Sequence, residues 1–330
     1  MGEYLVDVKN ERLSFFTPAG EVKALNDVSI HLKEGEVLGV VGESGSGKSV
    51  TAYSLMGLTA HPGKLLGGEL YFNGHQIETM SEKEIRKMRG NEISIIFQDP
   101  MTSLNPVYTI GNQITEVVRL HTDKTKQQAK ERARELLELV GINEPEKRLK
   151  QYPHELSGGM RQRVMIAIAL LCNPKLIIAD EPTTALDVTI QAQILDLLRD
   201  IKHKINGSIM LITHDLGVVA EMADFVVVMY AGRVIEMGTA EDIFDHPMHP
   251  YTIGLQKSKP TVDGEVDKLY CIPGFVPNPI NMPDYCYFRD RCEMCKEKCA
   301  GEYPGYVQVS PTHKVACYLY EDTKEDGNGQ

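Results

Sequence analysis

The chain has 330 residues, enough for one large domain and a smaller one, and its 42% hydrophobic and 25% charged residues are ordinary for a globular protein. The net charge of −11 argues against a general nucleic-acid-binding protein, which usually carries a basic face. No apolar run approaches the roughly 18 to 20 residues that span a bilayer, and the first residues lack the basic start and apolar middle of a signal peptide. The sequence therefore predicts a cytosolic protein whose seven cysteines are reduced thiols or metal ligands rather than disulfides.

The N-terminal part of the chain is predicted to form an antiparallel β layer. Residues 5–16 and 28–32 have strand patterns. Residues 69–72 form a further predicted strand, which runs into Asn73-Gly74, a typical two-residue hairpin signal.

A phosphate-binding motif follows the first strands. Residues 42–49 read Gly-Glu-Ser-Gly-Ser-Gly-Lys-Ser, which satisfies the phosphate-loop pattern. The apolar residues 37–41 suit a buried strand, and residues 50–56 can begin a helix. Glycines in such a loop let backbone N–H groups curl around phosphate oxygens, and the helix N-terminus adds partial positive charge. Lys48 is expected to neutralise the β- and γ-phosphates, and Ser49 to offer its hydroxyl to Mg²⁺.

The loop residues expected to contact the nucleotide are Ser44, Gly45, Ser46, Gly47, Lys48, Ser49 and Val50. Phe15 and Phe16 are of a type found more often in the core than against a ligand, but one of these rings can stack on a purine. We assign that role to Phe16.

The middle of the chain alternates helices and strands. A short charged helix is predicted at 81–88, and a strand at 93–97 delivers Gln98 at its end. An amphipathic helix at 125–140 ends at Gly141.

Two further motifs lie on strand and helix boundaries. Ser-Gly-Gly at 157–159 precedes a helix at 161–171 that is apolar nearly all round and is therefore predicted to be buried. A strand at 176–179 ends in Asp180-Glu181. After a phosphate loop, such a pair is suited to hold Mg²⁺ through Asp180 and to activate the attacking water through Glu181 as general base.

The last part of this region completes the strand pattern. A strand at 209–212 delivers His214, and residues 225–230 are predicted to pair with 233–236 across a tight turn at 231–232. Alternation of strands and helices predicts an α/β protein with a parallel, doubly wound sheet.

The C-terminal part differs in composition. Prolines and six of the seven cysteines mark a loop-rich extension at 256–320. The polar residues 321–330 are predicted to be a disordered tail.

The Leu-Ser-Gly-Gly motif at 156–159 is the signature sequence of ATP-binding cassette (ABC) proteins, and the chain resembles that family from about residue 4 to about residue 255. The resemblance implies an ABC-type P-loop nucleotide-binding domain at 1–255. Such a domain has a RecA-like core, an antiparallel β subdomain and a helical subdomain, here at about 99–170. It also implies an ATPase that uses ATP and Mg²⁺.

The resemblance assigns roles to individual residues. Gln98 matches the Q-loop glutamine that senses the γ-phosphate and faces the membrane subunits, and with Ser49 and Asp180 it is expected to hold Mg²⁺. His214 matches the switch histidine that contacts the γ-phosphate. The expected catalytic residues are therefore Glu181, His214 and Gln98.

Other matched residues imply a dimer. Ser157, Gly158 and Gly159 match the signature, which binds ATP held by the other subunit of a head-to-tail pair. Asp187 belongs to the Ala185-Leu186-Asp187 segment, which matches the dimer-interface loop. Closing and reopening of the pair around two nucleotides is the expected power stroke.

The C-terminal part resembles the extension of peptide-importer ATPases, at His249-Pro250-Tyr251-Thr252, Ile272-Pro273-Gly274, Pro277, Cys286, Phe288, Arg291 and Cys292. This implies the ATP-hydrolysing subunit of an importer that powers uptake of dipeptides or oligopeptides. A nickel or other small-solute importer of the same family is the alternative. The implied partners are two membrane permease subunits, a second homologous ATPase and an extracytoplasmic peptide-binding protein, with no nucleic acid. The implied location is peripheral, on the cytoplasmic face of the cell membrane.

Four cysteines match positions of that extension, namely Cys286, Cys292, Cys299 and Cys317. Four thiolates favour a tetrahedral thiolate site. Their gaps of five, six and seventeen residues fit poorly with the two tight pairs of a zinc module. A [4Fe–4S] cluster is therefore expected, with zinc as the alternative and Cys295 as the main rival ligand.

Two other classes of ABC protein fit the sequence less well. Those of DNA repair insert long coiled coils between the phosphate loop and the signature, where this chain has about 110 residues without sustained heptads. Translation-linked ABC proteins carry two cassettes in one chain, and this chain has one.

Overall fold

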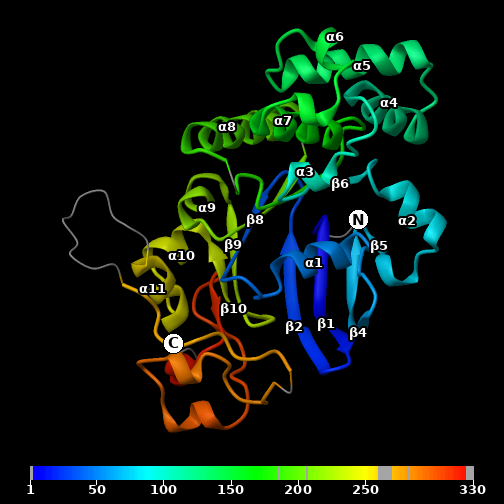
Figure 1. Ribbon diagram of the computed structural model, residues 1–330. Helices are drawn as coiled ribbons and strands as arrows, with labels where there is room; N and C mark the ends of the chain where they lie inside the picture. The colour runs from blue at the N-terminus through cyan, green and yellow to red at the C-terminus, as the bar shows by residue number, and fades with distance from the viewer. Residues whose placement is uncertain (1–2, 185, 206, 259–269, 281, 325–330) are drawn as a thin grey trace. The chain divides into compact units, whose positions relative to one another are not determined.

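The computed structural model describes residues 3–184, 186–205, 207–258, 270–280 and 282–324 (Figure 1). Ala185, the first residue of the expected dimer-interface loop, and most of the expected tail therefore lie outside the described residues. The chain divides into two compact units. The first unit consists of Met1–His31, Leu38–Glu78 and His214–Gln330, and the second of Leu32–Val37 and Thr79–Thr213.

The first unit contains all or most of β1 (Val6–Thr17), β2 (Gly20–Leu32), β3 (Val37–Val41), α1 (Lys48–Leu55), β4 (Gly63–Phe72), β5 (His75–Gln76), α9 (Leu216–Met222), β9 (Phe225–Tyr230), β10 (Arg233–Thr239), α10 (Ala240–Asp245), α11 (Pro250–Lys257), β11 (Val307–Gln308) and β12 (Lys314–Val315). It also has short 3-10 turns, η1 (Ile77–Thr79), η3 (Arg289–Arg291), η4 (Glu297–Ala300) and η5 (Tyr318–Lys324).

The second unit contains α2 (Glu82–Met88), β6 (Ile93–Ile96), α3 (Pro100–Ser103), α4 (Ile110–His121), α5 (Lys126–Leu139), α6 (Pro145–Arg148), η2 (Pro153–Glu155), α7 (Gly158–Ala169), β7 (Leu176–Asp180), α8 (Val188–Ile205) and β8 (Ser208–Thr213).

The predicted antiparallel layer is confirmed as a sheet with the order β2-β1-β4-β5, drawn in blue and cyan in Figure 1. β1 and β4 pair from Val6 with Phe72, and the hairpin at Asn73-Gly74 leads into β5. β2 begins at Gly20, eight residues earlier than predicted. Its first five residues are all half-buried and do not alternate between buried and exposed, so the period-2 signal of a strand is weak there.

The second sheet of the first unit has the order β11-β12-β10-β9-β3. β3 and β9 are parallel, as predicted, with Leu38 beside Phe225. β9 and β10 form the predicted antiparallel hairpin. β12, from the C-terminal end, then pairs with β10 at Glu236 and Val315. The sheet is therefore mixed rather than wholly parallel, because hairpins extend it on one side.

The C-terminal region shares its core with the rest of the first unit. Tyr287 and Phe288 pack with Val41, Tyr230 and Tyr251 in one buried cluster. The rings of Tyr230 and Tyr251 are 4.8 Å apart, and the ring of Phe288 lies 5.3 Å from Tyr230 and 5.5 Å from Tyr251. Such close aromatic packing stabilises the attachment of this region. Residues 321–324, the start of the expected tail, continue the turn η5.

The second unit carries the parallel part of the predicted fold. Its strands have the order β8-β7-β6, and Leu176 of β7 lies beside both Ile93 and Ser208. Helix α7 is buried, as its apolar sequence predicts. Helix α4 was not predicted, although Thr109 caps it and Ile110, Ile114 and Val118 form a buried stripe at helical spacing.

Candidate nucleotide-binding site

The phosphate loop lies between β3 and α1, in the strand, loop and helix order that the motif requires. Gly42 has φ 153°, and a Cβ there would lie 2.2 Å from the carbonyl oxygen of Met229. Gly47 has φ 99° and caps α1, and a Cβ there would lie 2.9 Å from the carbonyl oxygen of Ala24. Only glycine fits both positions, since other residues would be strained and would collide with the neighbouring backbone.

Lys48 lies under this loop and is 6% exposed. Its Nζ donates hydrogen bonds to the carbonyl oxygens of Gly42 and Glu43, at 2.7 and 3.0 Å. The ammonium group is thus directed along the loop. Ser46 Oγ is buried, and among the described residues it has no hydrogen-bond partner. An unsatisfied buried hydroxyl is costly, so the loop fits a ligand rich in oxygen atoms, such as a phosphate chain.

The remaining residues predicted from the loop region are accessible. Ser44 and Gly45 are exposed, and Ser49 and Val50 are half-buried in the first turn of α1. The side chain of Phe16 is 43% exposed, and Lys64 Nζ lies over its ring, 5.5 Å from the ring centroid. Phe15 is more buried than Phe16, so Phe16 is the better placed of the two to meet a ligand.

In the second unit, β7 ends at the predicted carboxylates. Asp180 is the last residue of the strand and is 2% exposed. Glu181 has φ 46°, a left-handed conformation that is uncommon for a residue with a side chain. Its Oε2 accepts hydrogen bonds from Gln98 Nε2 and from Thr184 Oγ1, both at 2.9 Å. The fold thus joins two residues predicted to be catalytic, and adds Thr184, a neighbour at i+3 that the sequence analysis did not single out.

The signature residues occupy the exposed start of a helix. Ser157 caps α7, and its Oγ accepts a hydrogen bond from Met160 N at 3.3 Å. Gly158 and Gly159 form its first turn, and a Cβ on Gly158 would meet no atom within 4 Å. This helix N-terminus carries the partial positive charge that favours binding of an anion.

Two further predicted residues precede helices. Asp187 Oδ1 accepts a hydrogen bond from Ile190 N at 3.0 Å, at the start of α8. His214 follows β8 directly and is exposed, just before Asp215 caps α9.

All four predicted cluster cysteines line one small cavity, whose free volume is about 10 Å³. Burial, with a smaller contribution from the neighbouring thiols, raises the pKa of Cys286 to about 12 and that of Cys317 to about 11. Cys295 is exposed, and its Sγ lies 3.5 Å from the carbonyl oxygen of Lys296. In the part of the chain that the structure describes, no group of three or more His, Cys, Asp or Glu side chains is placed to hold a metal ion.

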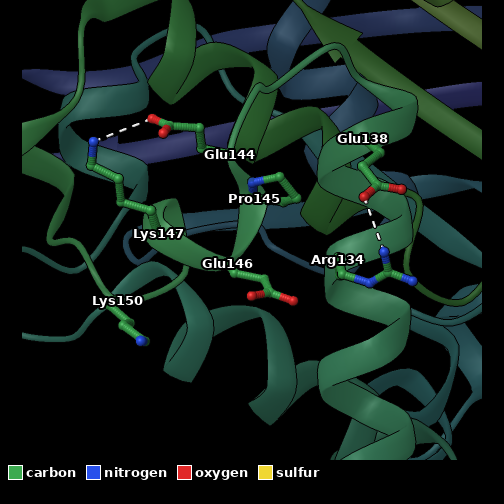
Figure 2. A pocket seen from close by; sticks show the side chains of 7 residues that line it. All are labelled: Arg134, Glu138, Glu144, Pro145, Glu146, Lys147 and Lys150. Carbon is green, nitrogen blue, oxygen red and sulfur yellow. Dashed lines mark hydrogen bonds and ion pairs between the residues drawn. The ribbon is translucent and has the colours of Figure 1, made fainter.

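Figure 2 shows a different pocket, of about 520 Å³, in the helical part of the second unit. It is lined by Arg134, Glu138, Glu144, Pro145, Glu146, Lys147 and Lys150. Its charges pair with one another, Lys147 with Glu144 and Arg134 with Glu138, each at 3.2 Å. It contains none of the motif residues, so it is not the candidate nucleotide site.

None of the described helices is long and apolar enough to cross a bilayer.

Comparison with known proteins agrees with the motifs. The ABC transporter family model matches residues 25–184. The solved dimer of the ATP-binding cassette MJ0796 bound to ADP and Pi is 28% identical, with a TM-score of 0.64 over 71% of this chain and 98% of that chain. The structure of cbiO1 from Clostridium perfringens has a TM-score of 0.62 and 28% identity, over 77% of this chain and 96% of that chain. The protein is an ABC-type ATPase with the α/β cassette fold.

More specific matches cover nearly the whole chain. The model for the C-terminal region of oligopeptide/dipeptide transporters matches residues 235–299. The oligopeptide transport ATP-binding protein AppD of Bacillus subtilis is 52% identical, over 96% of this chain and 97% of its own length. OppD of Escherichia coli is 52% identical, over 95% of this chain and 93% of its own length. The chain belongs to the family of oligopeptide and dipeptide transport ATP-binding proteins.

Proposed function

We propose that this chain is the ATP-hydrolysing subunit of an importer that powers uptake of dipeptides or oligopeptides. The observation that carries the proposal is the 52% identity to AppD over nearly the full length of both chains. It favours peptides over the nickel or small-solute alternative, since the relatives reported above are named for oligopeptide transport.

The proposed chemistry gives each motif residue a role. Lys48 and the loop N–H groups bind the phosphates, Phe16 stacks on the purine, and Ser49, Asp180 and Gln98 would hold Mg²⁺. The Mg²⁺ ion would neutralise charge on the phosphates. Glu181 accepts a proton from the attacking water, and His214 contacts the γ-phosphate. The hydrogen bond from Gln98 to Glu181 supports this arrangement, because it fixes the carboxylate that acts as base.

The proposed assembly is a head-to-tail dimer with a homologous ATPase. The exposed N-terminus of α7 supports it, since Ser157, Gly158 and Gly159 can meet the γ-phosphate of a nucleotide held by the opposing chain. Asp187 lies at the proposed interface. Two membrane permease subunits and an extracytoplasmic peptide-binding protein complete the complex, with this chain at the cytoplasmic face of the membrane. We propose the ATPase domain at 1–255, its helical subdomain at about 99–170 and a cysteine- and proline-rich extension at 256–320.

Reconstitution of the transporter tests the substrate. Proteoliposomes that contain this chain, its permeases and its partner ATPase are expected to hydrolyse ATP several-fold faster when the binding protein is loaded with peptide. They should also accumulate radiolabelled peptide only when ATP is supplied. Binding protein loaded with Ni²⁺ is the matched control. If Ni²⁺-loaded binding protein stimulates ATP hydrolysis and peptide-loaded binding protein does not, the protein belongs to a small-solute importer instead.

We also propose that Cys286, Cys292, Cys299 and Cys317 are the ligands of a metal centre, with a [4Fe–4S] cluster as the first candidate and zinc as the alternative. The donor chemistry supports it, because all four cysteines line one cavity. Burial there disfavours ionisation of Cys286, Cys292 and Cys317 unless a cation is present. The cavity in this structure is too small for a four-iron cluster. A cavity of about 10 Å³ is close to the smallest that holds one water molecule, so the thiols must move outward to admit a four-iron cluster.

Metal analysis of the full chain purified without oxygen tests this proposal. If the cluster is present, the protein should be brown, contain iron and absorb broadly at about 400 nm. Exposure to air should bleach this colour. Each of the four single Cys→Ser variants should lose most of the iron, while Cys295→Ser, the exposed neighbour, should keep it. Stoichiometric zinc without iron would replace the cluster by a zinc site, and protein with neither metal would end the proposal. Loss of metal from Cys295→Ser but not from Cys299→Ser would change the ligand set.

A further inference from the structure

The phosphate loop is bonded to the C-terminal region through Glu43, at the second position of the motif. Arg291, 248 residues away, donates from Nη1 to Glu43 Oε2 at 2.8 Å and from Nη2 to Oε1 at 3.1 Å. Arg291 is 8% exposed, and its Nε also donates to the carbonyl oxygen of Pro273 at 2.9 Å. A paired guanidinium and carboxylate in this bidentate geometry fix each other's position as well as their charge.

A second contact reaches the main chain of the same residue. The backbone N–H of Glu43 donates to Tyr251 Oη at 2.8 Å. Tyr251 is fully buried and packs on Tyr230 and Phe288, so it cannot easily move. The carbonyl oxygen of Gly42, at the other end of the same peptide group, accepts a hydrogen bond from Lys48 Nζ at 2.7 Å. Tyr251, which packs on Phe288 of the C-terminal region, therefore holds the peptide group that contacts the phosphate-binding lysine.

The negative charge of Glu43 means that its ion pair with Arg291 also affects phosphate binding. A carboxylate in a loop that binds phosphates repels them, and an adjacent guanidinium offsets that repulsion. Arg291 supplies this charge from the turn η3, which connects two of the cavity cysteines. Arg289 N donates to the carbonyl oxygen of Cys286 at 3.1 Å, and Cys292 N donates to that of Arg289 at 3.2 Å.

We propose that Arg291 is a positioning residue for the nucleotide reaction: it orients Glu43 and neutralises it, and through this pair the C-terminal region sets the nucleotide affinity of the phosphate loop. The proposal rests on the proposed role of the loop in binding ATP, and it requires no metal in the cysteine cavity.

The test is the dissociation constant of Mg-ATP, measured by calorimetric titration of the full chain. Arg291→Gln is expected to bind about tenfold more weakly, equivalent to about 1.4 kcal/mol. The double variant Glu43→Gln/Arg291→Gln should recover most of the affinity, because the repelling carboxylate is gone. Arg289→Gln is the matched control, since it removes the same positive charge from the same turn. The ion pair of Arg289 is with Asp290 and not with Glu43. This control should bind like the parent.

Parental affinity in Arg291→Gln would overturn the proposal, as would a double variant that binds as weakly as the single one. If Arg291→Gln does not fold, Glu43→Gln alone decides, because it removes the negative charge and retains Arg291. It should bind at least as tightly as the parent, and a tenfold weakening would contradict the charge argument. Lys48→Ala in the same titration distinguishes failure of the Arg291 proposal from failure of the proposed nucleotide site. Full binding by that variant would show that the nucleotide site itself is wrongly assigned.

Discussion

The Glu181→Gln variant is expected to bind Mg-ATP but to hydrolyse it about 10²- to 10⁴-fold more slowly, the usual contribution of a general base. Glutamine has the shape of glutamate and can still accept the hydrogen bonds that Gln98 and Thr184 donate to Oε2 in the parent. The substitution therefore removes the basic carboxylate while it preserves the local structure. The measurement is single-turnover hydrolysis of ATP by the complex of this chain with its partner ATPase.

The slow variant should also accumulate in the ATP-bound state. With hydrolysis blocked, the closed dimer should persist and elute earlier than the monomers in size-exclusion chromatography with ATP. Glu138→Gln is a suitable control, since it removes an exposed carboxylate of the same unit that pairs only with Arg134 among the contacts described above. Turnover by Glu181→Gln at the parental rate, or the absence of an ATP-dependent dimer, would refute the proposed role of Glu181 as general base.

The Lys48→Ala variant is expected to lose productive binding of Mg-ATP. Lys48 is buried beneath the phosphate loop, where its Nζ donates to Gly42 and Glu43. Alanine leaves the phosphates without this positive charge. Loss of one partner of a buried charge pair costs about 2 to 5 kcal/mol, so the affinity should fall by about 30-fold to several thousand-fold.

Titration with Mg-ATP measures this loss directly, and hydrolysis by the reconstituted transporter measures its consequence. Lys33→Ala, at an exposed lysine in the segment before β3, is the control for a simple change in net charge. The variant must also be shown to be folded, by circular dichroism. If Lys48→Ala hydrolyses ATP at the parental rate in the complex, the phosphate loop is not the catalytic site.

The sequence alone determined the features that depend on neighbours along the chain. The phosphate loop could be identified because its glycines must adopt positive φ at fixed positions, and Gly42, Gly45 and Gly47 do so. The helix predicted at 81–88 agrees with α2, whose start depends on a local capping box of Ser81 and Glu84. The hairpin at 231–232 was equally local, since Ala231 and Gly232 both have positive φ, as a tight turn requires.

The contacts between residues far apart in the sequence depend on the tertiary structure. Gln98 and Glu181 are 83 residues apart and share a hydrogen bond because β6 and β7 are adjacent parallel strands that end at the same edge. The C-terminal region was predicted only as a loop-rich extension, but β12 extends the sheet at β10 and Arg291 contacts the phosphate loop. No periodicity encodes such contacts, because they depend on strand order and on the packing of a shared core, which form only when the whole unit folds.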